Sequence, residues 1–203
     1  MKIAVLVAIF CLMPLLVLAQ SAELIPPPGW RFPEETDYSG SWQAFRTAIP
    51  EPFHVQADFN GDGLPDDAWI MLSTIHKGSG LFVFLAQQEG DPKVIVLDIN
   101  PVINKPQYMG IKVVQPGDYK TACGKGSVPC GRGEPEVLHL TLPAINYFVY
   151  EGANSFFWWD AQDAQSQSFK RTWMGYSKEK PVPYGHEQTH IPKSTSFPNP
   201  SSY

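Results

Sequence analysis

The amino-acid sequence predicts a mainly β protein that folds as a single antiparallel domain, arranged as a meander, a sandwich or a propeller-blade-like sheet. Short apolar runs bounded by Gly, Pro and Asp recur from residue 53 to residue 174, a pattern typical of antiparallel strands joined by tight turns. The chain holds 20 Pro and 16 Gly, which disfavours long helices because Pro removes a helical hydrogen bond. Apolar residues make up 43% of the chain, enough to build a buried core.

The predicted β domain covers residues 36–176 and begins with one short helix at residues 39–48, where Trp42, Phe45 and Ala48 recur at three-residue spacing. The strands are expected at residues 53–57, 68–74, 81–85, 94–97, 111–114, 137–142, 147–150, 156–159 and 169–174. The early runs are apolar on both faces, so their sheet is expected to be covered on both sides. The aromatic run 156–159 is interpreted as core, with two of its side chains facing inward. The less favoured alternative is that the outward pair marks a binding face.

Two segments of different composition flank this domain. Residues 20–35 form a Pro-rich lead-in, whose three consecutive prolines favour an extended conformation, and Trp30 and Phe32 are expected to dock it onto the domain. Residues 177–203 are rich in Pro and Ser and hold little aliphatic material. This composition predicts a disordered C-terminal tail.

Residues 1–19 have the pattern of a cleaved signal peptide. Lys2 precedes an almost continuous apolar run from Ile3 to Leu18. The small or modest residues at positions 17–19 suit a signal peptidase that cuts after Ala19, with Ala22 as a second cleavage position. The alternative is a retained membrane anchor, but a spanning helix needs ~20 apolar residues and this run contains Pro14. The sequence therefore predicts export to the periplasm or the cell exterior, with no membrane association after cleavage.

The charge of the chain limits its partners. The net charge is −5, and loss of Lys2 with the signal peptide changes it to −6. An acidic surface disfavours nucleic acid and anionic membranes as partners, and it suits a cation.

Signal cleavage also removes Cys11 and leaves Cys123 and Cys130. An even pair of cysteines in an exported chain predicts a disulfide. The alternative of a redox or zinc site is less favoured, because the six intervening residues match neither the redox spacing nor a four-ligand zinc set.

The most specific motif is the acidic loop, defined as residues 58–66. Asp58, Asn60, Asp62 and Asp66 place side-chain oxygens at loop positions one, three, five and nine. Gly63 at position six permits a sharp turn, and the carbonyl of Leu64 at position seven can add a ligand. Calcium takes six to eight oxygen ligands, so this spacing predicts one calcium ion, with water or Asp67 completing its shell.

Electrostatic repulsion favours the same interpretation over an empty acidic turn. Four carboxylates lie between Asp58 and Asp67. Two like charges ~4 Å apart repel by about 4 kcal/mol at an effective dielectric constant of 20. A bound divalent cation would remove this cost.

The acidic loop differs from an EF-hand, because Trp69 stands where the bidentate Glu would be and strands rather than helices flank it. With the strand that follows, it resembles the calcium loop of FG-GAP and VCBS repeats, over residues 54–86. The resemblance implies Asp58, Asn60, Asp62, the Leu64 carbonyl and Asp66 as ligands, and an ion that pins a hairpin without taking part in catalysis. It covers one such loop, whereas a propeller needs at least four blades.

A second motif, residues 186–190, matches the zincin pattern. His186 and His190 would bind zinc and Glu187 would activate water. Pro183 and Pro192 limit any helix there to about two turns, so the match is interpreted as accidental.

These observations lead to three hypotheses about function. The favoured one is a non-enzymatic calcium-binding interaction protein, such as an inhibitor or an adhesion-like module, whose partner is another protein or a cell-envelope component. The alternative is a secreted hydrolase that uses His186, Glu187 and His190 or the calcium site. The third is a purely structural envelope protein, and the sequence leaves the oligomeric state open.

Overall fold

A computed structural model describes residues 23–38, 49, 51–101, 109–149, 152–161 and 168–176. Within these ranges the protein is built from antiparallel strands and one short 3-10 turn, Glu35–Tyr38. The mainly β antiparallel fold predicted from the sequence is therefore confirmed. The predicted helix at residues 39–48 and the tail at residues 177–203 lie outside the described residues.

The first sheet is a meander of four strands with a short additional strand at one edge. Consecutive strands pair antiparallel along the chain, and β1 pairs with β3 at the end that β2 leaves free. The strands are β1 (Trp30–Arg31), β2 (His54–Ala57), β3 (Asp66–Ser73), β4 (Ser79–Leu85) and β5 (Lys93–Asn100). Turn residues between the apolar runs set these boundaries.

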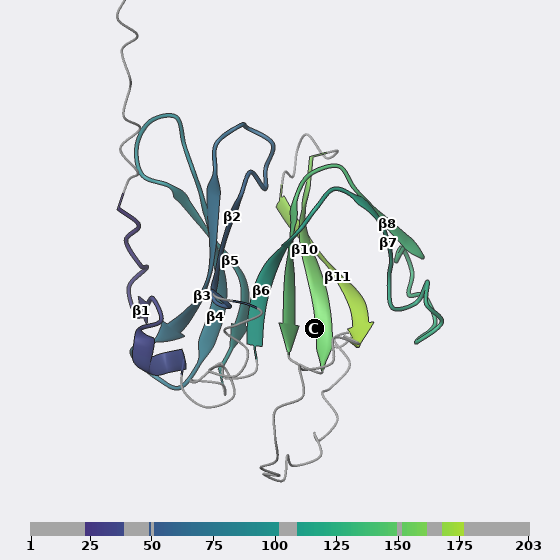
Figure 1. The fold of residues 1–203 in the computed structure, drawn as a ribbon, viewed down its shortest axis with the longest axis horizontal. Helices are drawn as coiled ribbons and strands as arrows, with labels where there is room; N and C mark the ends of the chain where they lie inside the picture. Colours follow the sequence, from purple (N-terminus) through teal and green to yellow (C-terminus); the bar gives the residue numbers. More distant parts are fainter. Residues whose placement is uncertain are drawn as a thin grey trace, which may run out of the picture.

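The second sheet has the order β11-β10-β9-β6, and a hairpin of two strands, β7 and β8, extends from it. The strands are β6 (Met109–Val114), β7 (Gly117–Lys120), β8 (Val137–Leu140), β9 (Ala144–Val149), β10 (Ala153–Asp160) and β11 (Ser168–Tyr176). Figure 1 shows the two sheets facing each other, with the β7–β8 hairpin on the far side of the second sheet. The fold is therefore a β-sandwich.

The main core lies between the sheets and takes side chains from both. Ile70 and Val83 of the first sheet pack in one cluster with Ile111, Ile145 and Phe157 of the second. All five are at most 3% exposed. Alternation of side chains along each strand directs this set to the inner faces.

The outer face of the first sheet is also covered over β3 and β4. Met71, Phe82 and Phe84 form a second buried cluster, against which Trp30 and Phe32 of the lead-in pack. The Trp30 and Phe82 rings are 4.7 Å apart and the Phe32 and Phe84 rings 6.0 Å apart. The expectation that Trp30 and Phe32 dock the lead-in is confirmed. Coverage on both sides is confirmed for β3 and β4, whereas the outer face of β5 is exposed.

The outer face of the second sheet is covered as well, as the interpretation of the aromatic run as core requires. Phe156 and Phe157 point to opposite faces, yet they are 6% and 3% exposed. The β7–β8 hairpin covers the outward face, where Leu138 and Leu140 pack with Phe156. The hairpin therefore buries Phe156 and packs beside the partly buried Trp158, in line with the interpretation of this run as core rather than with the alternative of a binding face.

The two long sides of the sandwich differ. On one side the sheets join, where the backbone N–H of Ile111 in β6 donates to the carbonyl of Pro52 just before β2, at 2.8 Å. On the other side β5 and β11 remain separate, and an open groove of about 430 Å³ lies between them. The lining of this groove includes Ile95, Leu97, Phe157, Phe169, Lys93 and Arg171.

Candidate functional site

The acidic loop connects β2 to β3 in the first sheet. The two strands pair antiparallel, with Ala57 opposite Asp66, so the loop is held at both ends by one ladder. Phe59, the second loop residue, is fully buried in the main core. Phe59 thus anchors the loop in the core, while Asp58 and Asn60 are partly exposed and Asp62 is exposed.

Asp66 is the buried end of this loop. Its side chain is fully buried, and its two oxygens accept hydrogen bonds from the backbone N–H groups of Phe59 and Ala86, each at 2.9 Å. Burial raises the pKa of Asp66 to about 6, and the two amide donors limit the rise. Asp66 therefore ties the loop both to its own start and to the end of β4.

The other side chains of the acidic loop bond to its own backbone. Asp58 accepts from the N–H groups of Gly61 and Gly63, at 2.7 and 2.9 Å. Asp62 accepts from the N–H of Leu64 at 2.8 Å, and from the side-chain amide of Asn60 at 2.9 Å. These are Asx-type turns, and they set the path of the loop.

Gly63 has the conformation that the spacing predicts. Its φ is +85°, in the left-handed region that side chains disfavour. No heavy atom lies within 4 Å of the position that a Cβ would take, so backbone conformation rather than space selects glycine here.

The donor chemistry of the acidic loop fits calcium. The candidate ligands are three carboxylates, one amide oxygen and one carbonyl, which are hard oxygen donors. Each side-chain oxygen that accepts one N–H keeps a second lone pair. Within the described ranges, however, no three His, Cys, Asp or Glu side chains stand where they could hold a metal ion together.

Asp67 faces away from the other candidate ligands. Its Oδ1 lies 2.6 Å from Nε2 of His54, on the opposite face of β3 from Asp66, because successive strand residues alternate. Asp67 is therefore a partner of His54, and the expectation that it completes a calcium shell is not supported by this placement.

His54 stands between two carboxylates. Its Nδ1 lies 3.3 Å from Glu51 Oε2, and its ring stacks on Trp69 with centroids 4.0 Å apart. Burial acts to lower the pKa of His54, but the hydrogen bonds with Asp67 and Glu51 outweigh it, so the pKa is raised. The sequence analysis did not foresee this cluster; His54 and Asp67 meet only once β2 and β3 pair.

The His54 cluster predicts a pH dependence of stability. A histidine whose pKa is raised by folding stabilises the protein fully below its unfolded pKa of about 6.5, and the contribution is lost as pH rises through the folded pKa. Because the folded pKa is raised, we expect the stability difference between the wild type and His54→Gln to shrink as pH rises above about 6.5. Urea denaturation at a series of pH values measures it, and a difference independent of pH would contradict the protonated pair.

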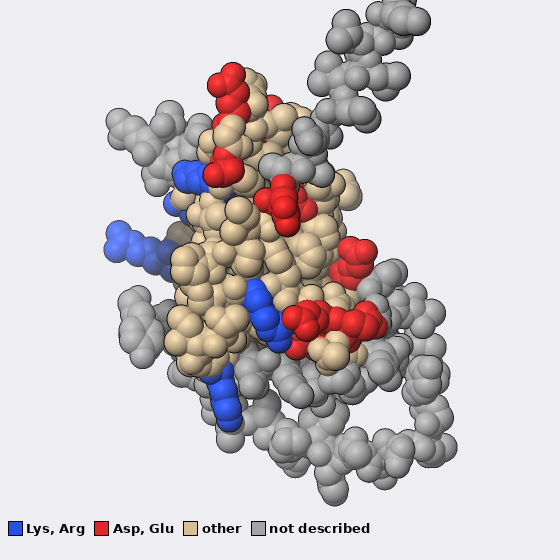
Figure 2. Space-filling view, turned by 90° about the vertical axis from the view of Figure 1, so that its left-hand side faces the viewer, with Lys and Arg blue, Asp and Glu red and all other residues tan. Residues whose placement is uncertain are grey.

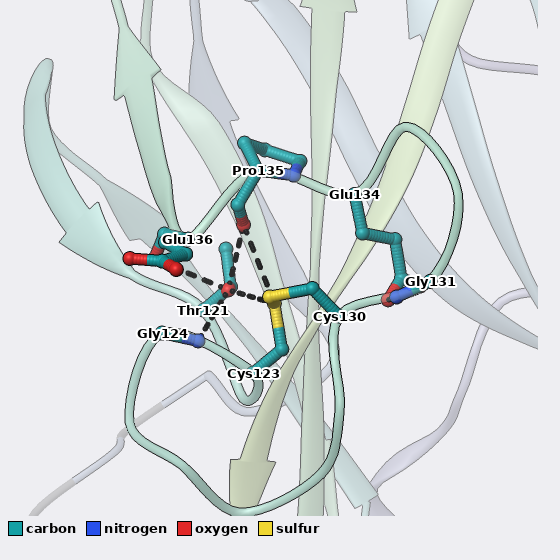
Figure 3. Close-up of a disulfide and its surroundings, with 8 residues drawn as sticks. All are labelled: Thr121, Cys123, Gly124, Cys130, Gly131, Glu134, Pro135 and Glu136. Atoms are coloured by element: carbon teal, nitrogen blue, oxygen red, sulfur yellow. Dashed lines mark hydrogen bonds between the residues drawn. A yellow bond between two sulfur atoms is a disulfide. The ribbon is translucent and has the colours of Figure 1, made fainter.

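The predicted disulfide between Cys123 and Cys130 is present, with Cα atoms 4.9 Å apart. Figure 3 shows Thr121 beside it; the Thr121 hydroxyl donates to the Pro135 carbonyl at 2.8 Å and accepts from the Gly124 N–H at 3.2 Å. A Cβ on Gly124 would collide with the Glu136 carbonyl, so the close approach of these two chain segments requires glycine. The bridge is structural, because it closes a loop packed against β11.

Together, the fold and the acidic loop define a disulfide-bonded antiparallel β-sandwich with an oxygen-rich loop between β2 and β3. Comparison with known proteins finds no matching family model, no matching curated protein and no matching solved structure. No helix among the described residues has the length and apolar character needed to cross a membrane. The signal-peptide segment 1–19 and the motif of His186, Glu187 and His190 lie outside those residues.

Proposed function

We propose that this protein is an exported, non-enzymatic interaction protein whose first sheet is pinned by one calcium ion in the acidic loop. The ligands are Asp58, Asn60, Asp62, the Leu64 carbonyl and Asp66. One observation carries the proposal: Asp66 is fully buried and fixed by two backbone amides, while Asp62 on the same loop is exposed.

This arrangement separates a fixed part of the site from an adjustable part. The buried carboxylate of Asp66 keeps its place through Phe59 and Ala86. Binding requires Asp58, Asn60 and Asp62 to turn toward it. A cation there would offset the repulsion between the loop carboxylates, which is about 4 kcal/mol for a pair ~4 Å apart at a dielectric constant of 20.

The proposed role of the ion is structural. It would hold the β2–β3 hairpin against β4, through the link from Asp66 to Ala86. The nearest histidine cluster, at His54, lies on the other face of β3 and contains no nucleophile. The interaction role is supported by exposed apolar side chains on β5, since exposed apolar patches mark interaction sites or ligand-binding grooves.

Calcium is expected to raise the thermal stability of the purified protein relative to the protein in EGTA. A ligand that binds only the folded state stabilises it by RT ln(1 + [L]/Kd), about 1.4 kcal/mol at ten times Kd. Exported calcium modules reach Kd values of ~10⁻⁴–10⁻³ M, so the titration extends into the millimolar range. Thermal melts followed by circular dichroism measure the shift.

Two isosteric variants test whether the calcium-dependent shift requires the acidic loop. Asp62→Asn retains an oxygen that can accept from the Leu64 N–H but removes one ligand charge, and it is expected to abolish most of the calcium-dependent shift. Asp91→Asn removes the same charge from an exposed turn outside the acidic loop, and its shift is expected to equal that of the wild type. A wild-type melting temperature that is indifferent to calcium would remove the proposed ion.

A further inference from the structure

The free edge of β5 is a surface that the calcium proposal does not explain. β5 pairs with β4 on one side, and no other backbone hydrogen bond involves Lys93–Ile99 among the described residues. In an antiparallel pair, alternate residues direct their N–H and C=O groups away from the partner strand. Such an unpaired edge is a template on which another strand can form.

The outer face of the same strand is apolar and exposed. Val94, Val96 and Ile99 are 39%, 49% and 52% exposed, although their partners in β4 lie in or beside the buried cluster under the lead-in. Figure 2 shows the side of the molecule that carries the first sheet, where most of the described surface is uncharged. Pairing with another strand would remove these side chains from water.

The edge strand of the second sheet is different, because the disulfide loop covers part of it. The N–H of Ala122 donates to the Trp173 carbonyl at 3.1 Å. The Lys125 ammonium donates to the Met174 carbonyl at 2.9 Å. The C-terminal half of β11 thus has hydrogen-bond partners that β5 lacks. Of the two edge strands, β5 is therefore the one that is open to pairing.

The inner face of β5 carries a positive charge at one end of the strand and a negative charge at the other. Lys93 lies opposite Leu85 and Asp98 lies opposite Leu81, both core residues, so both charged side chains are on the inner face. Lys93 forms no ion pair within the described residues, and Asp98 lies 3.5 Å from Arg171. A strand with a cation at one end and an anion at the other complements an antiparallel copy of itself.

We propose that β5 pairs antiparallel with β5 of a second copy of this chain, with Ile95 on the two-fold axis. Val94 then lies opposite Val96 of the second copy on the outer face, and Val96 opposite Val94. On the inner face, Lys93 comes beside Asp98 of the second copy, and the same pair forms again by symmetry. Parallel pairing would instead place like charges together.

A β-bulge limits this ladder to the first part of the strand. The pairing of β5 with β4 passes from Val96 to Asp98, so Leu97 is an extra residue. Bulges and inward charges also serve to protect free edges from association. The competing interpretation is therefore that Lys93 and Asp98 keep the protein monomeric, and the experiments below decide between the two.

The first experiment measures association of the purified protein by sedimentation equilibrium across micromolar concentrations, both in calcium and in EGTA. The wild type is expected to dimerise in a concentration-dependent manner in both solutions, because β5 lies outside the acidic loop; this result is separable from the calcium titration. Val96→Lys places a charge at the centre of the edge and is expected to leave a monomer. Tyr176→Lys, at another exposed apolar position (72% exposed), is expected to leave the dimer intact.

The second experiment uses charge reversal. Lys93→Asp and Asp98→Lys each place two like-charge contacts in the self-pair, and each is expected to raise the dimer dissociation constant about tenfold. An equimolar mixture of the two variants restores opposite charges at both contacts, so heterodimers are expected by native mass spectrometry. A merely structural effect of either substitution would not be rescued by mixing.

The outcomes are distinct. A wild type that stays monomeric throughout, with a native circular dichroism spectrum, would overturn the proposal and establish the charges as protective. A dimer that survives Val96→Lys would also overturn it, because another surface would then carry the contact. Loss of the dimer with Val96→Lys, retention with Tyr176→Lys and rescue on mixing would establish the β5 interface.

Discussion

Replacing Asp66 with Ala is expected to lower the free energy of unfolding by about 3–5 kcal/mol, both with calcium and in EGTA. The carboxylate is fully buried and accepts from the N–H groups of Phe59 and Ala86. Its removal leaves these donors without partners, and each unsatisfied buried group costs about 1–3 kcal/mol. Urea denaturation of the variant and the wild type measures the loss.

Two further variants test whether the loss of stability comes from the buried hydrogen-bond acceptor rather than from the loss of a carboxylate in this loop. Asp66→Asn keeps one acceptor oxygen and is expected to lose less stability than Asp66→Ala. Asp62→Ala removes an exposed carboxylate from the same loop, and its cost in EGTA is expected to stay below about 1 kcal/mol. Equal stability of Asp66→Ala and the wild type in EGTA would show that the buried hydrogen bonds do not hold the loop.

Removing the disulfide, by Cys123→Ser with Cys130→Ser, is expected to lower the free energy of unfolding by about 2–3 kcal/mol. The bridge spans seven positions, and without it the unfolded chain gains the freedom of an open loop. The folded loop would remain attached to β11 through Ala122 and Lys125. The expected change is therefore in the stability of the fold rather than in its topology.

Reductant provides the control for the disulfide. A reducing agent is expected to lower the stability of the wild type toward that of the double variant, while the double variant itself stays unchanged. Circular dichroism at low denaturant concentration is expected to be the same for both proteins. If reduction left the wild-type midpoint unaltered, the bridge would contribute nothing to stability.

Local patterns in the sequence were sufficient to predict most of the strands. The runs around Ile70, Val83 and Phe148 were predicted as strands from their apolar residues and the turn residues that bound them, and each lies in a strand, although β9 begins at Ala144, three residues before the predicted start. Such runs are informative because main-chain turns and side-chain alternation depend on neighbouring residues alone. The short strands β1 and β7 escaped notice, since Trp30–Arg31 and Gly117–Lys120 have no apolar run.

The acidic loop shows which contacts a local sequence pattern cannot predict. The spacing of Asp58, Asn60 and Asp62 predicted a sharp turn at Gly63, whose φ is +85°. It also predicted oxygens gathered around one ion, but no three acidic side chains among the described residues stand where they could hold a metal together. It could not reveal that Asp66 bonds to Ala86, twenty residues away. It also left Asp67 as a candidate ligand, because the facing of a strand residue depends on which neighbour it pairs with.

By itself, the sequence determined the antiparallel strand class, the pairing of Cys123 with Cys130 and the composition of the acidic loop, because each depends on residue type and short spacing. Only the tertiary structure decided that the strands form two facing sheets, that the β7–β8 hairpin buries Phe156, and that β5 remains an open edge. These features depend on contacts between residues far apart in the chain. No local pattern of side chains specifies such contacts, since the same alternation fits either face of either sheet.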